Sequence, residues 1–133
     1  MYYIIRVTTF IEQPLFTKQI TDLVDDDDYR EFQNELAKNP EKGTVVEGCG
    51  GLRKVRMALP GRGKSGGARV LYLLFPQKQT IIFYYLYTKG EIDDIPEGKK
   101  KGIRNEVQRI KKVFNERDRV QRGPSHREPP RPR

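Results

Sequence analysis

Apolar side chains recur along the chain at different spacings, and the spacing in each segment predicts its secondary structure. Residues 2–10 are rich in aromatic and β-branched side chains, which favour a strand. Over residues 15–24 and 28–38 the apolar side chains return at helical spacing, which predicts two short helices. Asp28 and Glu31 have the spacing of a capping box, so we expect the second helix to begin at Asp28.

Alternation replaces helical spacing in the middle of the chain. The side chains of residues 52–59 alternate in polarity, with Lys54 and Arg56 on one face of the predicted strand. Residues 68–75 form a near-continuous apolar run, typical of a central strand that is covered on both faces. Residues 80–89 predict a third strand, rich in aromatic side chains. Because these strands follow one another through short connections, we expect them to form an antiparallel meander.

The C-terminal part of the chain falls into two segments. An apolar stripe on an otherwise charged background predicts a surface helix over residues 97–116. Residues 117–133 contain four prolines and six arginines, so we expect a disordered tail there. The sequence therefore predicts one domain over residues 1–116, followed by a basic, proline-rich tail.

Positive charge is concentrated in one part of the chain. The formal net charge is +8, and residues 48–90 contain eight basic residues and no acidic residue. Outside this basic window, acidic and basic residues are equal in number. A solvated surface normally mixes both signs, so a window of one sign favours a phosphate-rich partner.

Composition excludes several classes of protein. Cys49 is the only cysteine, so the chain has neither an internal disulfide nor a cysteine-based zinc site. The first residues lack the basic region and the cleavage site of a signal peptide. No apolar run reaches membrane-spanning length, so we expect a cytoplasmic protein with no membrane partner.

A nucleotide-binding loop is the first interpretation of the glycines in the basic window. Gly63-Lys64-Ser65 matches the end of the phosphate-binding motif, but its first glycine would fall at Ala58. That motif also leads into a helix, whereas residues 68–75 predict a strand. We therefore reject ATP or GTP binding.

Cleavage of RNA is the chemistry that suits these basic residues better. Lys54 and Arg56 project from one face of a strand, Arg69 opens the next strand, and Lys89 closes the one after it. Converging cations stabilise negative charge on a phosphate and favour the neutral amine of a nearby lysine, which can then act as a base. The ribose 2′-hydroxyl supplies the nucleophile, so we expect a site that needs no metal and no cofactor.

The motifs GGLRKVR, GKSGGAR and YTKGE, followed by an acidic turn, resemble the RelE/HigB group of bacterial toxins in the RelE/ParE superfamily. The resemblance is most specific over residues 48–95 and extends with weaker motifs over residues 10–114. It implies a RelE-like α+β fold, in which N-terminal helices and a C-terminal helix pack on a small twisted antiparallel sheet.

The resemblance also implies a function and a set of catalytic residues. It implies the toxin of a type II toxin–antitoxin system, a metal-independent endoribonuclease that cleaves mRNA on the ribosome and inhibits translation. It implies a cognate antitoxin of the helix-turn-helix type. Lys54 then falls at the position of the base, Arg56 and Arg69 at the phosphate clamp, and Lys89 at a supporting cation. Either Tyr87 or Lys89 could protonate the leaving group.

Four residues are candidates for contacts with RNA outside the catalytic step. Arg53 lies on the face opposite Lys54, where it either touches RNA or lies at a sheet edge. Arg62 and Lys64 lie in a glycine-rich loop that is either solvated or bound to RNA. Tyr87 either stacks on a base or belongs to the core.

Two other functions stay open at this stage. A relative that blocks DNA gyrase, as ParE-type toxins do, would bind a protein and cleave nothing. A non-catalytic nucleic-acid-binding module would use the same basic residues. Lys54, Arg56 and Arg69 together favour the endoribonuclease, because a gyrase inhibitor has no need of a phosphate clamp.

Overall fold

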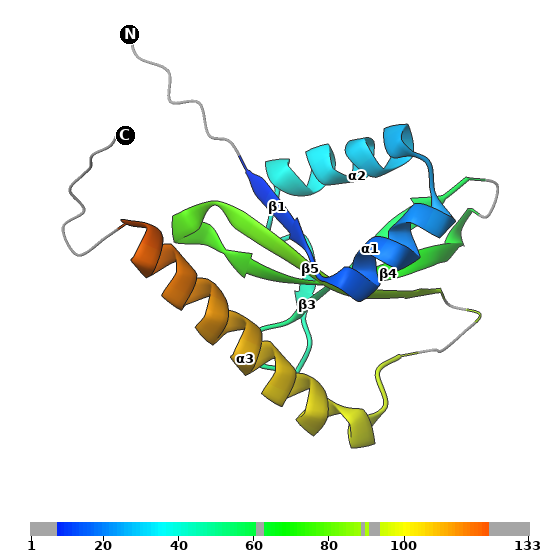
Figure 1. Cartoon of the computed structure of the whole chain (residues 1–133). Coiled ribbons are helices and arrows are strands. Elements are labelled where there is room, and N and C mark those ends of the chain that lie inside the picture. Colours follow the sequence, from blue (N-terminus) through cyan, green and yellow to red (C-terminus); the bar gives the residue numbers. More distant parts are fainter. Residues whose placement is uncertain (1–7, 61–62, 89, 91–93, 123–133) are drawn as a thin grey trace, which may run out of the picture. The chain divides into compact units, whose positions relative to one another are not determined.

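A single five-stranded sheet with the strand order β1-β5-β4-β3-β2 organises the chain (Figure 1). The computed structural model describes residues 8–60, 63–88, 90 and 94–122. The strands are β1 (Thr9–Glu12), β2 (Thr44–Val45), β3 (Arg53–Leu59), β4 (Gly63–Phe75) and β5 (Thr80–Thr88). The helices are α1 (Pro14–Leu23), α2 (Asp26–Lys38), the 3-10 turn η1 (Pro76–Lys78) and α3 (Glu97–Arg122).

The α+β class predicted from the sequence is confirmed, but the sheet is mixed rather than antiparallel throughout. Strands β3, β4 and β5 form the expected antiparallel meander. Strand β1 instead pairs with β5 in parallel, with Thr9 opposite Thr80 and Glu12 opposite Phe83. Short connections determine the direction of neighbouring strands. No short connection joins β1 to β5, so the sequence pattern could not determine how β1 pairs.

Two predicted boundaries differ from the observed ones. Of the strand predicted over residues 2–10, residues 2–7 lie outside the described residues, and β1 extends beyond it to Glu12. Helix α2 begins earlier than predicted, because Asp25 is its N-cap and accepts a hydrogen bond from the Asp28 backbone N at 2.8 Å. Asp28 therefore lies in the first turn, where the charge of Asp25 raises the pKa of its carboxyl group.

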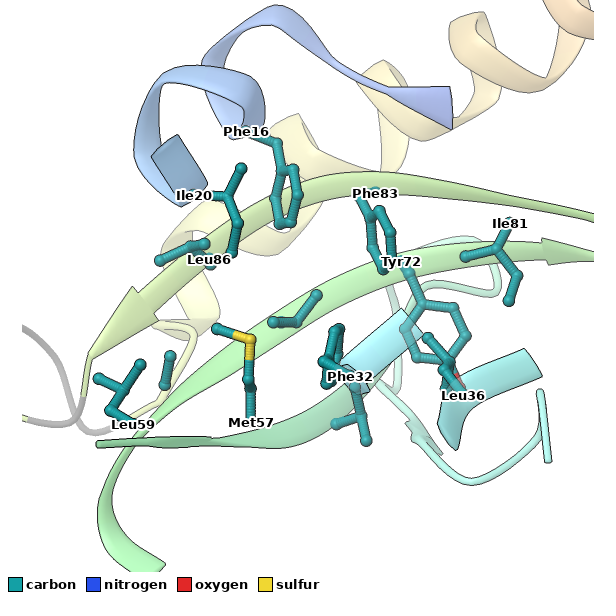
Figure 2. Packing of buried hydrophobic residues seen from close by; sticks show 13 residues of the cluster. Phe16, Ile20, Phe32, Leu36, Met57, Leu59, Tyr72, Ile81, Phe83 and Leu86 are labelled. Atoms are coloured by element: carbon teal, nitrogen blue, oxygen red, sulfur yellow. The ribbon is translucent and has the colours of Figure 1, made fainter. Parts of the chain in front are cut away.

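Helices α1 and α2 cover one face of the sheet. Helix α1 contributes Phe16 and Ile20, and α2 contributes Phe32 and Leu36, to one buried cluster with β3, β4 and β5 (Figure 2). The Phe83 ring lies centrally in that cluster, 4.8 Å from the Phe16 ring and 6.0 Å from the Phe32 ring. Aromatic contacts of this kind add to the stability that burial provides.

A β-bulge in β5 decides which of its side chains join this core. Tyr72 lies opposite Phe83, but Leu71 lies opposite Tyr85, so β5 has one residue more than β4 between these pairs. The extra residue reverses the alternation, which places Leu86 in the core cluster and Tyr87 on the other face.

The Gln19 side chain of α1 binds the strand just beyond this bulge. Its Nε2 donates to the Leu86 carbonyl at 2.7 Å, and its Oε1 accepts from the Leu86 N–H at 3.0 Å. The register of β1 with β5 ends at Phe83, so the Gln19 amide supplies the bonds that a neighbouring strand would have made.

The described part of the chain divides into two compact units. The single domain expected over residues 1–116 stays a prediction. The sheet, α1 and α2 belong to the first unit, which extends to Ile95. The second unit consists of Gly48–Gly50 and the chain from Pro96 onward, including α3. Helix α3 runs to Arg122, so residues 117–122 are helical rather than part of a tail.

Hydrogen bonds hold the second unit together. Arg104 Nη1 donates to the Gly48 carbonyl at 3.2 Å, and Lys111 Nζ donates to the Gly50 carbonyl. Gly48 and Gly50 have φ angles of 80° and 71°, which residues with a side chain rarely adopt. This conformation explains why glycines precede the basic strand in the sequence.

Candidate active site

Three neighbouring strands place Arg56, Arg69 and Tyr87 in one row across the sheet. In β3 and β4 Arg56 lies opposite Arg69, and in β4 and β5 Arg69 lies opposite Tyr87. Side chains opposite each other on adjacent strands are neighbours on the same face. This cross-strand row lies on the face away from the core, because the adjacent Val70 and Leu86 belong to the core cluster.

Lys54 joins the row through Asp94. Lys54 lies two residues before Arg56 in β3 and therefore projects from the same face. Its Nζ is 3.1 Å from Asp94 Oδ1, and the Tyr87 hydroxyl is 3.5 Å from the same oxygen. One carboxylate oxygen thus connects a lysine of β3 with a tyrosine of β5.

One nitrogen of the Arg69 guanidinium is a hydrogen-bond donor suited to an anion. Its Nη1 is buried and makes no hydrogen bond with any of the described residues. A buried N–H group without a partner costs stability, and a charged donor costs more than a neutral one. A phosphate oxygen would satisfy this donor with a short, charge-assisted bond.

Arg56 lies on the exposed side of the same row. It also lines a pocket of about 420 Å³ with Asp28, Glu31 and Glu35 of α2. Arg56 is therefore accessible to a large ligand, while Arg69 lies deeper in the sheet.

Tyr87 is buried, with only 2% of its surface exposed. Burial raises the pKa of Tyr87 to about 12, and the Asp94 carboxylate acts in the same direction. The charge of Arg69 opposes this rise. Tyr87 is thus a protonated hydrogen-bond donor at neutral pH, and its ring has no free face on which a base could stack.

Of the other predicted RNA contacts, Arg53 does not join this row. Arg53 lies on the opposite face, where its Nη1 donates to the Gly43 carbonyl at 2.7 Å and to the Glu41 carbonyl at 3.3 Å. These bonds tie β3 to the chain before β2, which is a structural task. Lys64 lies in the first part of β4, and Arg62 and Lys89 lie outside the described residues.

Asp94 is the site residue that sequence reasoning missed. It lies in the acidic turn that follows β5, and that turn drew attention only as part of a motif. The sequence places Lys54 in a cluster of cations, whereas the structure also places the Asp94 carboxylate against its side-chain nitrogen. The feature of the sequence that could have identified Asp94 is a carboxylate shortly after the last basic strand.

The arrangement can bind a phosphate at Arg69 and Arg56 and can exchange protons at Lys54 and Tyr87. Among the described residues, no group of three or more metal-ligating side chains comes together. Within the same residues, none of the helices has the length and apolar character needed to cross a membrane.

Comparisons with known proteins give a family and similar solved structures. A family model described as the RelE toxin of the RelE/RelB toxin–antitoxin system matches residues 34–119, which include β3, β4, β5 and most of α3. A chain in the crystal structure of the intact E. coli RelBE toxin–antitoxin complex is similar with a TM-score of 0.47 and 14% identity. That match covers 60% of this chain and 94% of the other.

Proposed function

Since the chain belongs to the RelE family of toxins from toxin–antitoxin systems, we propose that it is an endoribonuclease that cleaves mRNA on the ribosome and thereby inhibits translation. The observation that carries this proposal is the buried Nη1 of Arg69, which has no hydrogen-bond partner among the described residues, in a row with Arg56 and Tyr87. A protein that only contacts another protein has no need of such a buried donor.

In the proposed reaction the scissile phosphate lies against Arg69 and Arg56. A planar guanidinium donates two parallel hydrogen bonds to phosphoryl oxygens, and this stabilises the charge that accumulates in the transition state. The ribose 2′-oxygen bonds to the adjacent phosphorus, and the bond from phosphorus to the 5′-oxygen breaks. The products are a 2′,3′-cyclic phosphate and a free 5′-hydroxyl group, and no metal takes part.

Lys54 and Tyr87 are the proposed proton-transfer groups. Lys54, as a neutral amine, accepts the proton of the 2′-hydroxyl. Tyr87 gives its proton to the departing 5′-oxygen, for which it is suited because its pKa of about 12 keeps it protonated at neutral pH. We assign the leaving-group acid to Tyr87 rather than Lys89 because Tyr87 is a member of the cross-strand row. Lys89 keeps its proposed role as a supporting cation.

An antitoxin is the proposed protein partner, and the cytoplasm is the proposed site of action, because ribosomes are the target. We expect the antitoxin to be encoded beside the toxin and to be of the helix-turn-helix type. Bound antitoxin would keep the basic face from the ribosome.

Brief expression of the chain without an antitoxin tests the proposed function. We expect growth arrest and new 5′ ends within translated mRNA, detected by primer extension. Arg69→Ala should abolish both effects, while Lys18→Ala, which removes an exposed cation of α1, should leave both unchanged. Growth arrest with intact mRNA and altered DNA supercoiling would instead support a gyrase inhibitor. Ribosome binding without cleavage by the natural chain would support a binding module.

A further inference from the structure

Asp94 accepts several hydrogen bonds, although its side chain is mostly exposed. Its Oδ1 accepts from Lys54 Nζ at 3.1 Å, from the Tyr87 hydroxyl at 3.5 Å and from the Ile95 backbone N–H at 2.8 Å. The Asp94 side chain is 63% exposed, whereas the Lys54 side chain is only 28% exposed. The exposed Asp94 carboxylate is thus held by the backbone N–H of the next residue, Ile95, and its Oδ1 contacts Lys54 and Tyr87.

We infer that Asp94 is a positioning residue that holds the base Lys54 and the acid Tyr87 on a single oxygen and acts on Tyr87 through its charge. This inference rests on the proposed function, because it concerns the two groups that we propose to transfer protons.

The geometry carries the positioning part of the inference. Lys54 has a long flexible side chain, and an ion pair restricts its ammonium to one place beside the row. A hydrogen bond from Tyr87 to the same oxygen directs the phenol toward that place. Misplacing a reacting group by a fraction of its contact distance can cost about a hundredfold in rate.

The charges around Tyr87 support the second part of the inference, which concerns the protonation of its hydroxyl. Three charged groups face Tyr87: Lys54 from β3, Arg69 from β4 and Asp94 from the turn after β5. The negative charge of Asp94 favours the neutral phenol of Tyr87 and so raises its pKa. If Asp94 loses its charge, Tyr87 releases its proton at lower pH.

The first test needs no catalysis. We expect the titration of the Tyr87 hydroxyl, followed by carbon NMR of the ring in the free protein, to move to lower pH in Asp94→Asn. Asp22→Asn, the same change at an exposed position of α1, should leave the Tyr87 titration in place. An unchanged Tyr87 titration in a folded Asp94→Asn variant would overturn the inference.

The second test measures mRNA cleavage on programmed ribosomes at saturating and at limiting toxin concentration. We expect Asp94→Asn to lower the rate at saturation by about ten- to a hundredfold, to leave the half-saturating concentration unchanged, and to be rescued in part by Asp94→Glu. A rate within twofold of the natural chain would overturn the inference. Arg69→Ala separates the two ideas: if it also cleaves normally, the proposed function fails, and if only Asp94→Asn cleaves normally, the inference alone fails.

Discussion

At the scale of single residues, the environment of each cation decides its role, and the charge alone does not. Arg53 and Arg69 are both arginines on neighbouring strands of the basic window. Arg53 has two backbone carbonyls as partners, while the Nη1 of Arg69 has no partner among the described residues. The first arginine stabilises the fold, and the second is the one that an anionic ligand would satisfy.

Arg69→Ala should lower the rate of mRNA cleavage by about a hundred- to a thousandfold, because it removes a preorganised donor to the phosphate, worth about 3–4 kcal/mol in the transition state. Ribosome co-sedimentation should weaken only slightly, since other cations of the basic window are still present. Thermal melting should confirm a folded variant. Near-normal cleavage by that variant would contradict the assignment of Arg69.

The raised pKa of Tyr87 predicts how the free energy of unfolding depends on pH. Its pKa is about 12 in the folded protein, above the ordinary value of 10.0, so the folded state favours the neutral phenol. The contribution of Tyr87 to stability is therefore complete below pH 10 and is lost as the pH rises towards 12. We expect the free energy of unfolding, measured in urea at each pH, to fall less over this range in Tyr87→Phe. Parallel curves for the two proteins would contradict this.

At the scale of elements, small backbone irregularities decide which side chains meet. The bulge in β5 brings Tyr87 beside Arg69 and sends Leu86 to the core. Without the extra residue, Leu86 would lie opposite Arg69, and Tyr87 would point into the helical side of the sheet. Close strand contact at Gly67 is a second such feature, since a β-carbon there would lie 2.4 Å from the Met57 carbonyl oxygen.

Two glycine substitutions should therefore have opposite effects on stability. Gly67→Ala should destabilise the protein by about 1–3 kcal/mol, because the β3 and β4 backbones must move apart. Gly102→Ala, in the interior of α3 with open space around it, should stabilise that helix by about 0.5–1 kcal/mol. Chemical denaturation followed by circular dichroism measures both changes. A Gly67→Ala variant as stable as the natural chain would refute the close contact.

At the scale of the whole molecule, the sheet separates the hydrophobic core from the candidate active site. Helices α1 and α2 cover one face, and Lys54, Arg56 and Arg69 project from the other. The net charge of +8 comes from the basic window, which contains β3, β4 and β5. A polyanion would therefore meet the positive charge of the sheet directly.

Ribosome binding should consequently depend steeply on salt. With about four phosphate contacts, the affinity should fall roughly a hundredfold between about 50 and about 200 mM salt, because each contact releases condensed counter-ions. Arg56→Ala should reduce the slope of log affinity against log salt by about one, whereas Lys18→Ala should leave it unchanged. Co-sedimentation over a salt series provides the slope. Binding that is insensitive to salt would rule out a phosphate-based interface.

The sequence by itself determined the two N-terminal helices, the antiparallel meander and the face on which Lys54 and Arg56 lie. These features depend on local spacing, and the period of apolar side chains reports it directly. The match to known motifs then assigned Lys54, Arg56 and Arg69 to one site, and the observed register brings Arg56 and Arg69 together.

Only the tertiary structure decided the parallel pairing of β1, the position of Tyr87 and the contacts of Asp94. Each depends on residues that are distant along the chain, or on one extra residue that reverses a strand's alternation. The pattern of a single segment contains no information on which neighbour it meets. An ion pair between Lys54 and Asp94 likewise follows from where the turn after β5 returns to β3, which no local spacing encodes.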